Sequence, residues 1–148
     1  MDESEQYGRR NNIRISGFPV ISGENTDDIV LQMAKEMAVK LDIEDIDRSH
    51  RVGKKVDVRR DILVKFSSYR YRRQFLQSRK KLRNSHPFRN VYINEDLTKR
   101  RANIMKEVRQ MVETNCLKSA WTYEGRMLMK DHDDKTHVIA SLTQLRRI

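Results

Sequence analysis

The sequence RRDILVKF at residues 59–66 alternates apolar and polar residues behind a pair of arginines. This alternation predicts a half-buried β-strand, with Ile62, Val64 and Phe66 on one face and Lys65 on the other. We expect the apolar face to build a core. The opposite face would then present Lys65 to solvent in the middle of a sheet.

The charge around this strand is strongly positive. The chain has 148 residues and a net charge of +10, but residues 48–89 alone hold 15 Lys and Arg against two acidic residues, a net charge of +13. Residues 1–47 carry −6 and residues 90–148 carry +3. Such asymmetry favours nucleic acid or an anionic membrane surface as partner over a small neutral substrate.

Several classes of site are disfavoured by the composition. A single cysteine, Cys116, excludes an internal disulfide and a zinc site built on thiolates. No P-loop, GxSxG or dinucleotide-binding fingerprint occurs among the five glycines. We therefore expect no enzyme, no catalytic residues and no cofactor. No run of 18 apolar residues and no signal peptide is found, which predicts a soluble intracellular protein without a membrane partner.

One cluster keeps an enzymatic alternative open. His132, Asp133, Asp134 and His137 lie close in sequence, as in a metal-dependent nuclease. Their spacing is unlike that of metal ligands and their composition is typical of a turn, so we expect no metal. Incubating RNA with the protein and a divalent metal would distinguish a nuclease, which shortens the RNA, from a binding protein.

The segments around residues 59–66 predict an ordered set of elements. Residues 13–17 form a short strand with Arg14 on its open side. Residues 26–28 cap a helix over residues 29–41, and residues 48–53 form a strand before a basic loop. Ser67 and Ser68 cap a helix over residues 69–82, and residues 91–93 form a fourth strand.

This order, βαββαβ, predicts an α+β, ferredoxin-like domain, in which two helices cover one face of a four-stranded antiparallel sheet. The RNA-recognition motif has this order and stacks bases on aromatic residues of its first and third strands. Here Arg14, Asp61 and Leu63 occupy those positions, so the usual stacking platform is absent. We expect an atypical RNA-recognition motif over residues 9–94, preceded by a leader at residues 1–8.

Residues 95–148 predict a second, small α+β domain. Glu95 and Asp96 suit a helix start, and apolar residues at helical spacing continue to about Asn115. Residues 119–123 and 126–130 read as a hairpin, residues 136–139 as a further strand, and Ser141 opens a last helix through residue 148.

Two constellations suggest nucleic-acid contacts. Strands one and three are neighbours in an RNA-recognition motif, so Arg14 and Lys65 would lie close together and favour an anion between them. A phosphate backbone would supply that anion without specifying sequence. Trp121 and Tyr123 share a strand face near Arg126 and are suited to stacking bases, unless the only tryptophan is needed for a core.

Four blocks of this sequence together resemble the first-open-reading-frame (ORF1) proteins of LINE-type retrotransposons, over about residues 6–148. The blocks are RRNNIRISG at 9–17, SHRVG at 49–53, ILVKF at 62–66 and INEDLT at 93–98. The resemblance implies an upstream coiled coil that trimerises, an atypical RNA-recognition motif and a C-terminal domain that together clamp single-stranded nucleic acid. It also implies a nucleic-acid chaperone in a ribonucleoprotein particle active in transposition.

The resemblance also implies binding positions and partners. The matching positions are Asn12, Arg14, Lys65, Arg79 or Lys80, the Arg100-Arg101 pair, and Trp121 or Tyr123. We expect a homotrimer in a longer chain, a monomer for these residues alone, and cytoplasmic particles with nuclear entry. A baculovirus few-polyhedra-like or domesticated relative, and a structural adaptor for acidic protein patches, remain alternatives.

The complete set of candidate contacts for single-stranded RNA and DNA combines the resemblance with the basic composition. It comprises Asn12, Arg14, His50, Arg51, Lys54, Lys55, Arg59, Arg60, Lys65, Arg79, Lys80, Lys81, Arg100, Arg101, Trp121, Tyr123 and Arg126.

Overall fold

The structure is a computed structural model and describes residues 2–54 and 59–145. It divides the chain into two compact units: Asn11–Asp96, here the contiguous unit, and Met1–Arg10 with Leu97–Ile148, here the composite unit. The predicted α+β class is confirmed, since both units combine helices with an antiparallel sheet. The predicted boundaries followed residues 8 and 94, whereas the units divide after residues 10 and 96.

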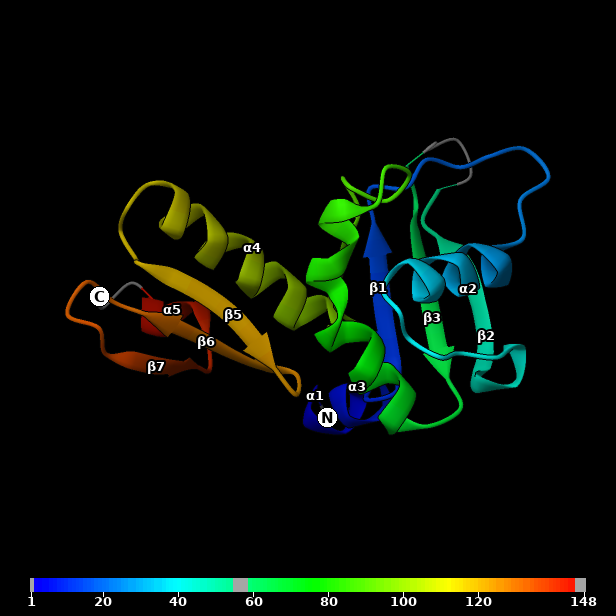
Figure 1. The fold of residues 1–148 in the computed structure, drawn as a ribbon. Helices are drawn as coiled ribbons and strands as arrows, with labels where there is room; N and C mark the ends of the chain where they lie inside the picture. The colour runs from blue at the N-terminus through cyan, green and yellow to red at the C-terminus, as the bar shows by residue number, and fades with distance from the viewer. Residues whose placement is uncertain (1, 55–58, 146–148) are drawn as a thin grey trace. The chain divides into compact units, whose positions relative to one another are not determined.

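A four-stranded antiparallel sheet forms the contiguous unit. Its strands lie in the order β2-β3-β1-β4, and Figure 1 shows α2 and α3 on one face of the sheet. The elements in chain order are β1 (Asn12–Ser16), α2 (Thr26–Glu36), the 3-10 helix η1 (Ile43–Asp45), β2 (Ile46–Val52), β3 (Asp61–Phe66), α3 (Tyr69–Gln77), the 3-10 helix η2 (Arg79–Asn84) and β4 (Tyr92–Glu95).

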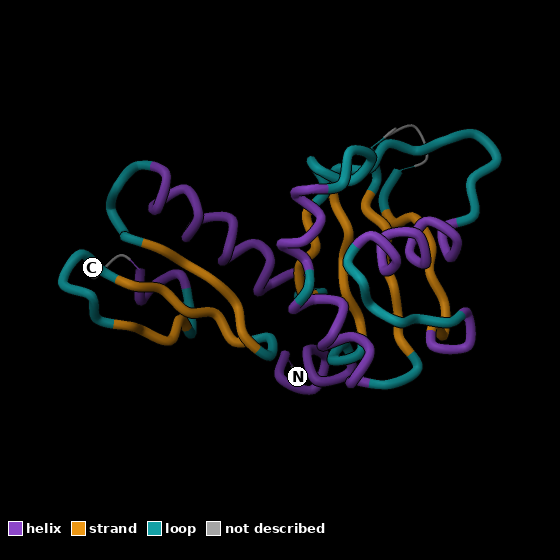
Figure 2. The backbone as a smooth tube through the Cα atoms, in the orientation of Figure 1, coloured by secondary structure: helices purple, strands orange, loops and turns teal. Residues whose placement is uncertain are grey.

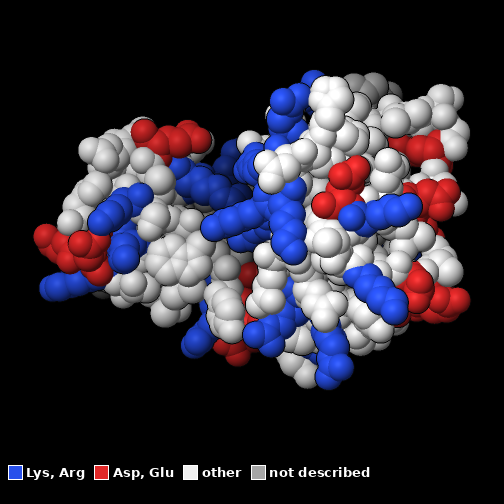
Figure 3. Space-filling view, viewed as in Figure 1, with Lys and Arg blue, Asp and Glu red and all other residues white. Residues whose placement is uncertain are grey.

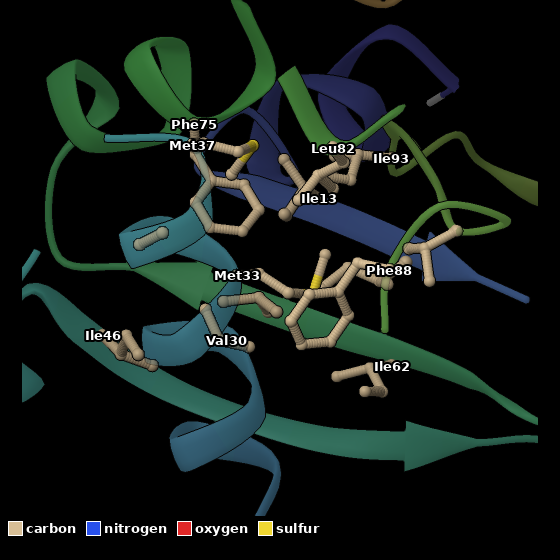
Figure 4. Packing of buried hydrophobic residues seen from close by; sticks show 14 of the residues in the cluster. Ile13, Val30, Met33, Met37, Ile46, Ile62, Phe75, Leu82, Phe88 and Ile93 are labelled. Atoms are coloured by element: carbon tan, nitrogen blue, oxygen red, sulfur yellow. The ribbon is translucent and has the colours of Figure 1, made fainter. Parts of the chain in front are cut away.

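The core of the contiguous unit lies between the sheet and these helices. The predicted inward residues of β1 and β3 are all buried, and Figure 4 shows Ile13 and Ile62 together with Met33 of α2 and Phe75 of α3. Met33 of α2 and Met37, which directly follows the helix, pack as core residues, as predicted. The opposite face, here the open sheet face, carries the polar side chains of the strands.

Two helices of this unit are shorter than predicted. The residue that caps α2 is Asn25, not Thr26, because its side chain accepts a hydrogen bond from the Asp28 amide at 3.2 Å. The helix ends at Glu36 because Ala38 turns into the left-handed region, with φ 58°. The predicted helix over residues 69–82 likewise divides after Gln77 into α3 and the tighter η2.

The composite unit packs one long helix on a three-stranded sheet, drawn in purple and orange in Figure 2. Its elements are α1 (Asp2–Gly8), α4 (Lys99–Glu113), β5 (Ser119–Tyr123), β6 (Arg126–Lys130), β7 (Thr136–Ile139) and α5 (Leu142–Leu145). The three predicted strands are confirmed at their predicted bounds. Residues 146–148, the predicted end of the last helix, lie outside the described residues.

The start of α4 differs from the prediction. Thr98 caps the helix by accepting a hydrogen bond from the Arg101 amide at 3.3 Å, so Glu95 and Asp96 precede it. Glu95 instead forms a buried ion pair with Arg72 of α3, at 2.8 Å. Among the described residues, no helix is both long and apolar enough to cross a bilayer.

Candidate nucleic-acid interface

The open sheet face is arranged in rows by the strand register. One row joins Asn12 to Lys65 and Arg48, and the next contains Arg14, Leu63 and His50. Arg14 and Lys65 are therefore diagonal neighbours, not a directly opposed pair. Arg14 and Leu63 lie directly opposite each other on the two central strands.

Carboxylates of the same unit already pair with the cations of this face. The Arg14 guanidinium lies 3.3 Å from Asp61 and 3.6 Å from Asp96, and the Lys65 ammonium lies 3.8 Å from Asp47. The Asn12 amide nitrogen also donates to Asp96, at 3.1 Å. We expected Arg14 and Lys65 to favour an anion between them, and Asp61, Asp96 and Asp47 already place negative charge beside these two cations.

Arg51 was predicted to contact RNA, but its side chain is largely buried. Its side chain is only 5% exposed and lies 2.8 Å from Glu24, and it also donates to the carbonyl oxygens of Phe18 and Arg60. These contacts hold the loop before α2 against the end of β2. Arg51 is thus a structural residue, and its guanidinium is not presented to a ligand.

The remaining candidates near β2 and β3 are placed as follows. His50 is exposed on the open sheet face, opposite Leu63. Lys54 and Arg59 are exposed and Arg60 is half-buried. Lys55 lies outside the described residues.

The second helical region carries exposed cations, here called the basic segment: Arg70, Arg73, Arg79, Lys80, Lys81 and Arg83 of α3 and η2. None of the six forms an ion pair within the described part of the chain. Figure 3 shows Lys and Arg gathered over this side of the contiguous unit, and acidic side chains toward α2. The cations of the basic segment could therefore bind a phosphate without displacing a carboxylate, unlike Arg14 and Lys65 of the open sheet face.

Arg70, Arg73, Arg83 and Tyr92 were not among the predicted contacts. Tyr92 of β4 is 54% exposed, and the Arg83 guanidinium carbon lies 5.1 Å from its ring centre. The sequence could have predicted the exposure of Tyr92, because alternation along the strand places it on the other face of the sheet from Val91 and Ile93.

The sheet of the composite unit presents a second candidate surface, here called the aromatic face: Trp121, Tyr123, Leu128 and Val138, with Arg126. The register places Trp121, Leu128 and Val138 in one row across three strands, and Tyr123 opposite Arg126. Trp121 is 37% exposed and Tyr123 is 63% exposed.

The core below this sheet does not depend on the aromatic pair. Met127 and Met129 point the other way, into the core beneath α4. The two aromatic side chains share a face, as predicted, and stand on its solvent side. We did not predict that Leu128 and Val138 lie beside Trp121 on this face. Their pairing depends on the order of β5, β6 and β7 in the sheet, which the sequence pattern does not give.

Arg100 and Arg101 meet in a pocket of about 510 Å³ within the composite unit, which Arg126 and Val138 also line. The Arg101 side chain is 14% exposed and donates to the Gly125 carbonyl at 2.7 Å. It also pairs with Asp2 at 2.8 Å, whereas Arg100 is half exposed. The predicted pair is thus brought together with Arg126, beside an acidic residue of the leader.

The histidine and aspartate cluster forms local contacts near a turn. The Asp131 carboxylate accepts hydrogen bonds from His137 at 2.7 Å and from the Lys135 amide at 3.0 Å, which lower its pKa. Asp134 is paired with Lys118, and His132 contacts the Asn115 carbonyl at 2.7 Å. Within residues 2–54 and 59–145, no group of three or more His, Cys, Asp or Glu side chains is placed to hold a metal ion.

Comparison of the sequence with protein-family models and with curated proteins finds no match to either.

Proposed function

We propose that this chain binds single-stranded RNA, and single-stranded DNA, as the nucleic-acid-binding part of a LINE-type ORF1 protein. The observation that carries the proposal is the aromatic face, where exposed Trp121 and Tyr123 stand beside Arg126. Proteins that bind single strands combine aromatic stacking positions with cations that follow the phosphate backbone. A face of this kind suits unpaired bases, because bases within a duplex are already stacked.

The fold of the contiguous unit supports the same proposal. The strand order β2-β3-β1-β4, with β1 and β3 in the centre, matches the order of a ferredoxin-like RNA-recognition motif. Because the central strands carry no aromatic residue on the open sheet face, we propose that this unit contributes phosphate contacts through its basic segment. Base stacking is assigned to the aromatic face of the composite unit.

Chaperone activity follows from this division of roles. Phosphate contacts position a strand without reading its sequence, so binding would be tight, sensitive to salt and weakly selective. A cation-rich surface also screens the repulsion between two strands and so favours exchange of their pairing. We propose that a longer chain uses these properties to coat RNA in ribonucleoprotein particles.

Fluorescence anisotropy with single-stranded RNA, single-stranded DNA and duplex RNA of equal length, titrated across salt, tests the proposal. We expect both single strands to bind more tightly than the duplex, with a steep negative salt dependence. Tyr123→Ala should cost about 1 to 3 kcal/mol of single-strand binding, the usual loss when one stacked base loses its aromatic partner.

Tyr7→Ala is the matched control. Tyr7 of α1 is 67% exposed, and its ring centre lies 4.2 Å from the guanidinium carbon of Arg10, so its replacement removes the same kind of side chain from a residue that is not part of the aromatic face. Preferential binding of the duplex, or equal losses for Tyr7→Ala and Tyr123→Ala, would contradict the proposal.

A further inference from the structure

Asp2, in the leader, forms ion pairs with the two arginines that line the pocket of the composite unit. The Asp2 carboxylate lies 2.8 Å from Arg101 Nε, 3.4 Å from Arg100 Nη1 and 2.7 Å from the Thr98 hydroxyl. These donors converge on one carboxylate, whose side chain is 24% exposed. Although burial alone would raise the pKa of Asp2, the hydrogen bonds from Thr98 and Arg101 hold it below its ordinary value.

The helix that carries Asp2 is held in place by a second residue. Gln6 is 7% exposed and its side-chain oxygen accepts a hydrogen bond from the Thr98 amide at 2.9 Å. Its side chain lies so close to Gly125 that a Cβ added there would come within 2.6 Å of Gln6 Cγ. Asp2 and Gln6 therefore fix α1 to the start of α4 and to the β5–β6 turn.

The contacts of Asp2 are those that a phosphate oxygen would seek. Arginine nitrogens and hydroxyl groups form charge-assisted hydrogen bonds with carboxylates and with phosphates alike. Arg101 already uses Nε for Asp2 and Nη1 for the Gly125 carbonyl, so a phosphate can reach its Nε only if Asp2 leaves. Arg100 is 50% exposed and can be approached first.

We propose that Asp2 is an internal competitor for backbone phosphate at Arg100 and Arg101, so that α1 restricts access of a nucleic-acid strand to this pocket. The proposal rests on the proposed function, because it concerns a site on the same binding surface. Linkage makes the effect reciprocal: a strand that displaces Asp2 loosens α1, and a change that loosens α1 tightens strand binding.

Asp2→Asn tests this competition, because it keeps the size of the side chain and removes its charge. We expect affinity for single-stranded RNA to rise by about fivefold or more, the lower end of typical coupling between sites. The control is Glu5→Gln, which removes the same charge from an exposed position of the same helix. In an Arg100→Ala, Arg101→Ala background, Asp2→Asn should no longer raise affinity.

Equal effects of Asp2→Asn and Glu5→Gln, or weaker binding by Asp2→Asn in a folded protein, would overturn the competition. Absence of single-strand binding in the wild type and in every variant would overturn the proposed function instead.

A second measurement on the wild type does not depend on any substitution. The Thr98 amide proton, bonded to Gln6, reports the docking of α1 through its hydrogen exchange. We expect bound single-stranded RNA to accelerate this exchange. Exchange that stays the same or slows when RNA binds would show that α1 remains docked, and would exclude the proposed competition.

Discussion

Whether a basic side chain can meet a ligand depends on what it already contacts within its own unit. Arg51 has a carboxylate and backbone carbonyls as partners, and only 5% of its side chain is exposed. Lys80, in contrast, is exposed in η2. The two residues contribute the same charge to the sequence and have different roles.

Arg51→Ala should therefore reduce stability and leave the exposed cations of the basic segment unchanged. The substitution leaves the Glu24 carboxylate, whose side chain is 12% exposed, without its charged partner. Removing one member of a buried ion pair lowers the free energy of unfolding by about 3 to 5 kcal/mol. Urea denaturation at neutral pH would measure this loss. Lys54→Ala removes an equal charge from an exposed position, and equal midpoints for the two variants would contradict the structural role of Arg51.

The cost of Arg51→Ala should also depend on pH. The hydrogen bond from Arg51 lowers the pKa of Glu24 from its ordinary value of 4.5, against the opposing effect of burial. A lowered folded-state pKa contributes stability that is fully present above about pH 4.5 and is lost as the pH falls through the folded value. The difference between wild type and variant should thus shrink at pH 3.

For single residues, the sequence predicted which face of a strand a side chain occupies better than it predicted which residue that side chain contacts. The period of two along residues 119–123 was enough to place Trp121 and Tyr123 on one face. It could not reveal that Arg51 pairs with Glu24, because 27 residues separate them and no local pattern relates the two.

At the scale of elements, α3 and η2 carry the exposed positive charge that we propose for phosphate contacts. Lys80 and Lys81 are exposed on η2 and make no ion pair with a described residue, whereas Arg14 and Lys65 on the open sheet face each have a carboxylate partner. A paired cation gains less from a phosphate, because the phosphate must compete with the existing carboxylate. The basic segment should therefore contribute more to binding than the sheet.

Combined Lys80→Ala and Lys81→Ala substitutions should weaken binding about equally for all single-stranded sequences. The slope of log affinity against log salt should fall by about two, since each phosphate contact contributes about one. Arg14→Ala with Lys65→Ala is the matched control, because it also removes two positive charges. We expect this pair to weaken binding less, and a larger loss in anisotropy titrations would place the main phosphate track on the sheet.

The elements themselves were mostly predictable because alternation and helical spacing are local signals. The ends of helices were less predictable. The left-handed turn at Ala38 has no glycine to announce it, and the change from α3 to η2 falls within an unbroken run of polar and basic residues.

At the scale of the whole molecule, the composite unit is discontinuous in sequence. Its two segments meet where the Thr98 amide donates a hydrogen bond to Gln6, 92 positions earlier in the sequence. The sequence predicted residues 95–148 as a domain of their own, because apolar periodicity cannot show that a distant polar helix completes it.

The contiguous and composite units should accordingly respond differently when the chain is divided. A fragment of residues 11–96 contains its whole core and should unfold cooperatively on its own. A fragment of residues 97–148 lacks α1, which leaves the Thr98 amide without its partner, at a cost of about 1 to 3 kcal/mol. Thermal unfolding followed by circular dichroism would compare the two fragments.

A peptide of residues 1–10 added in trans should restore this stability, because it returns Gln6 to Thr98 and Asp2 to Arg101. The same peptide with Asp2→Ala and Gln6→Ala should not do so, although its other residues are unchanged. If the 97–148 fragment unfolds at one temperature with either peptide or with none, α1 is an accessory of this unit. If only the unaltered peptide raises that temperature, the leader is part of the folded unit, and Asp2 is held where it can compete with a phosphate for Arg100 and Arg101.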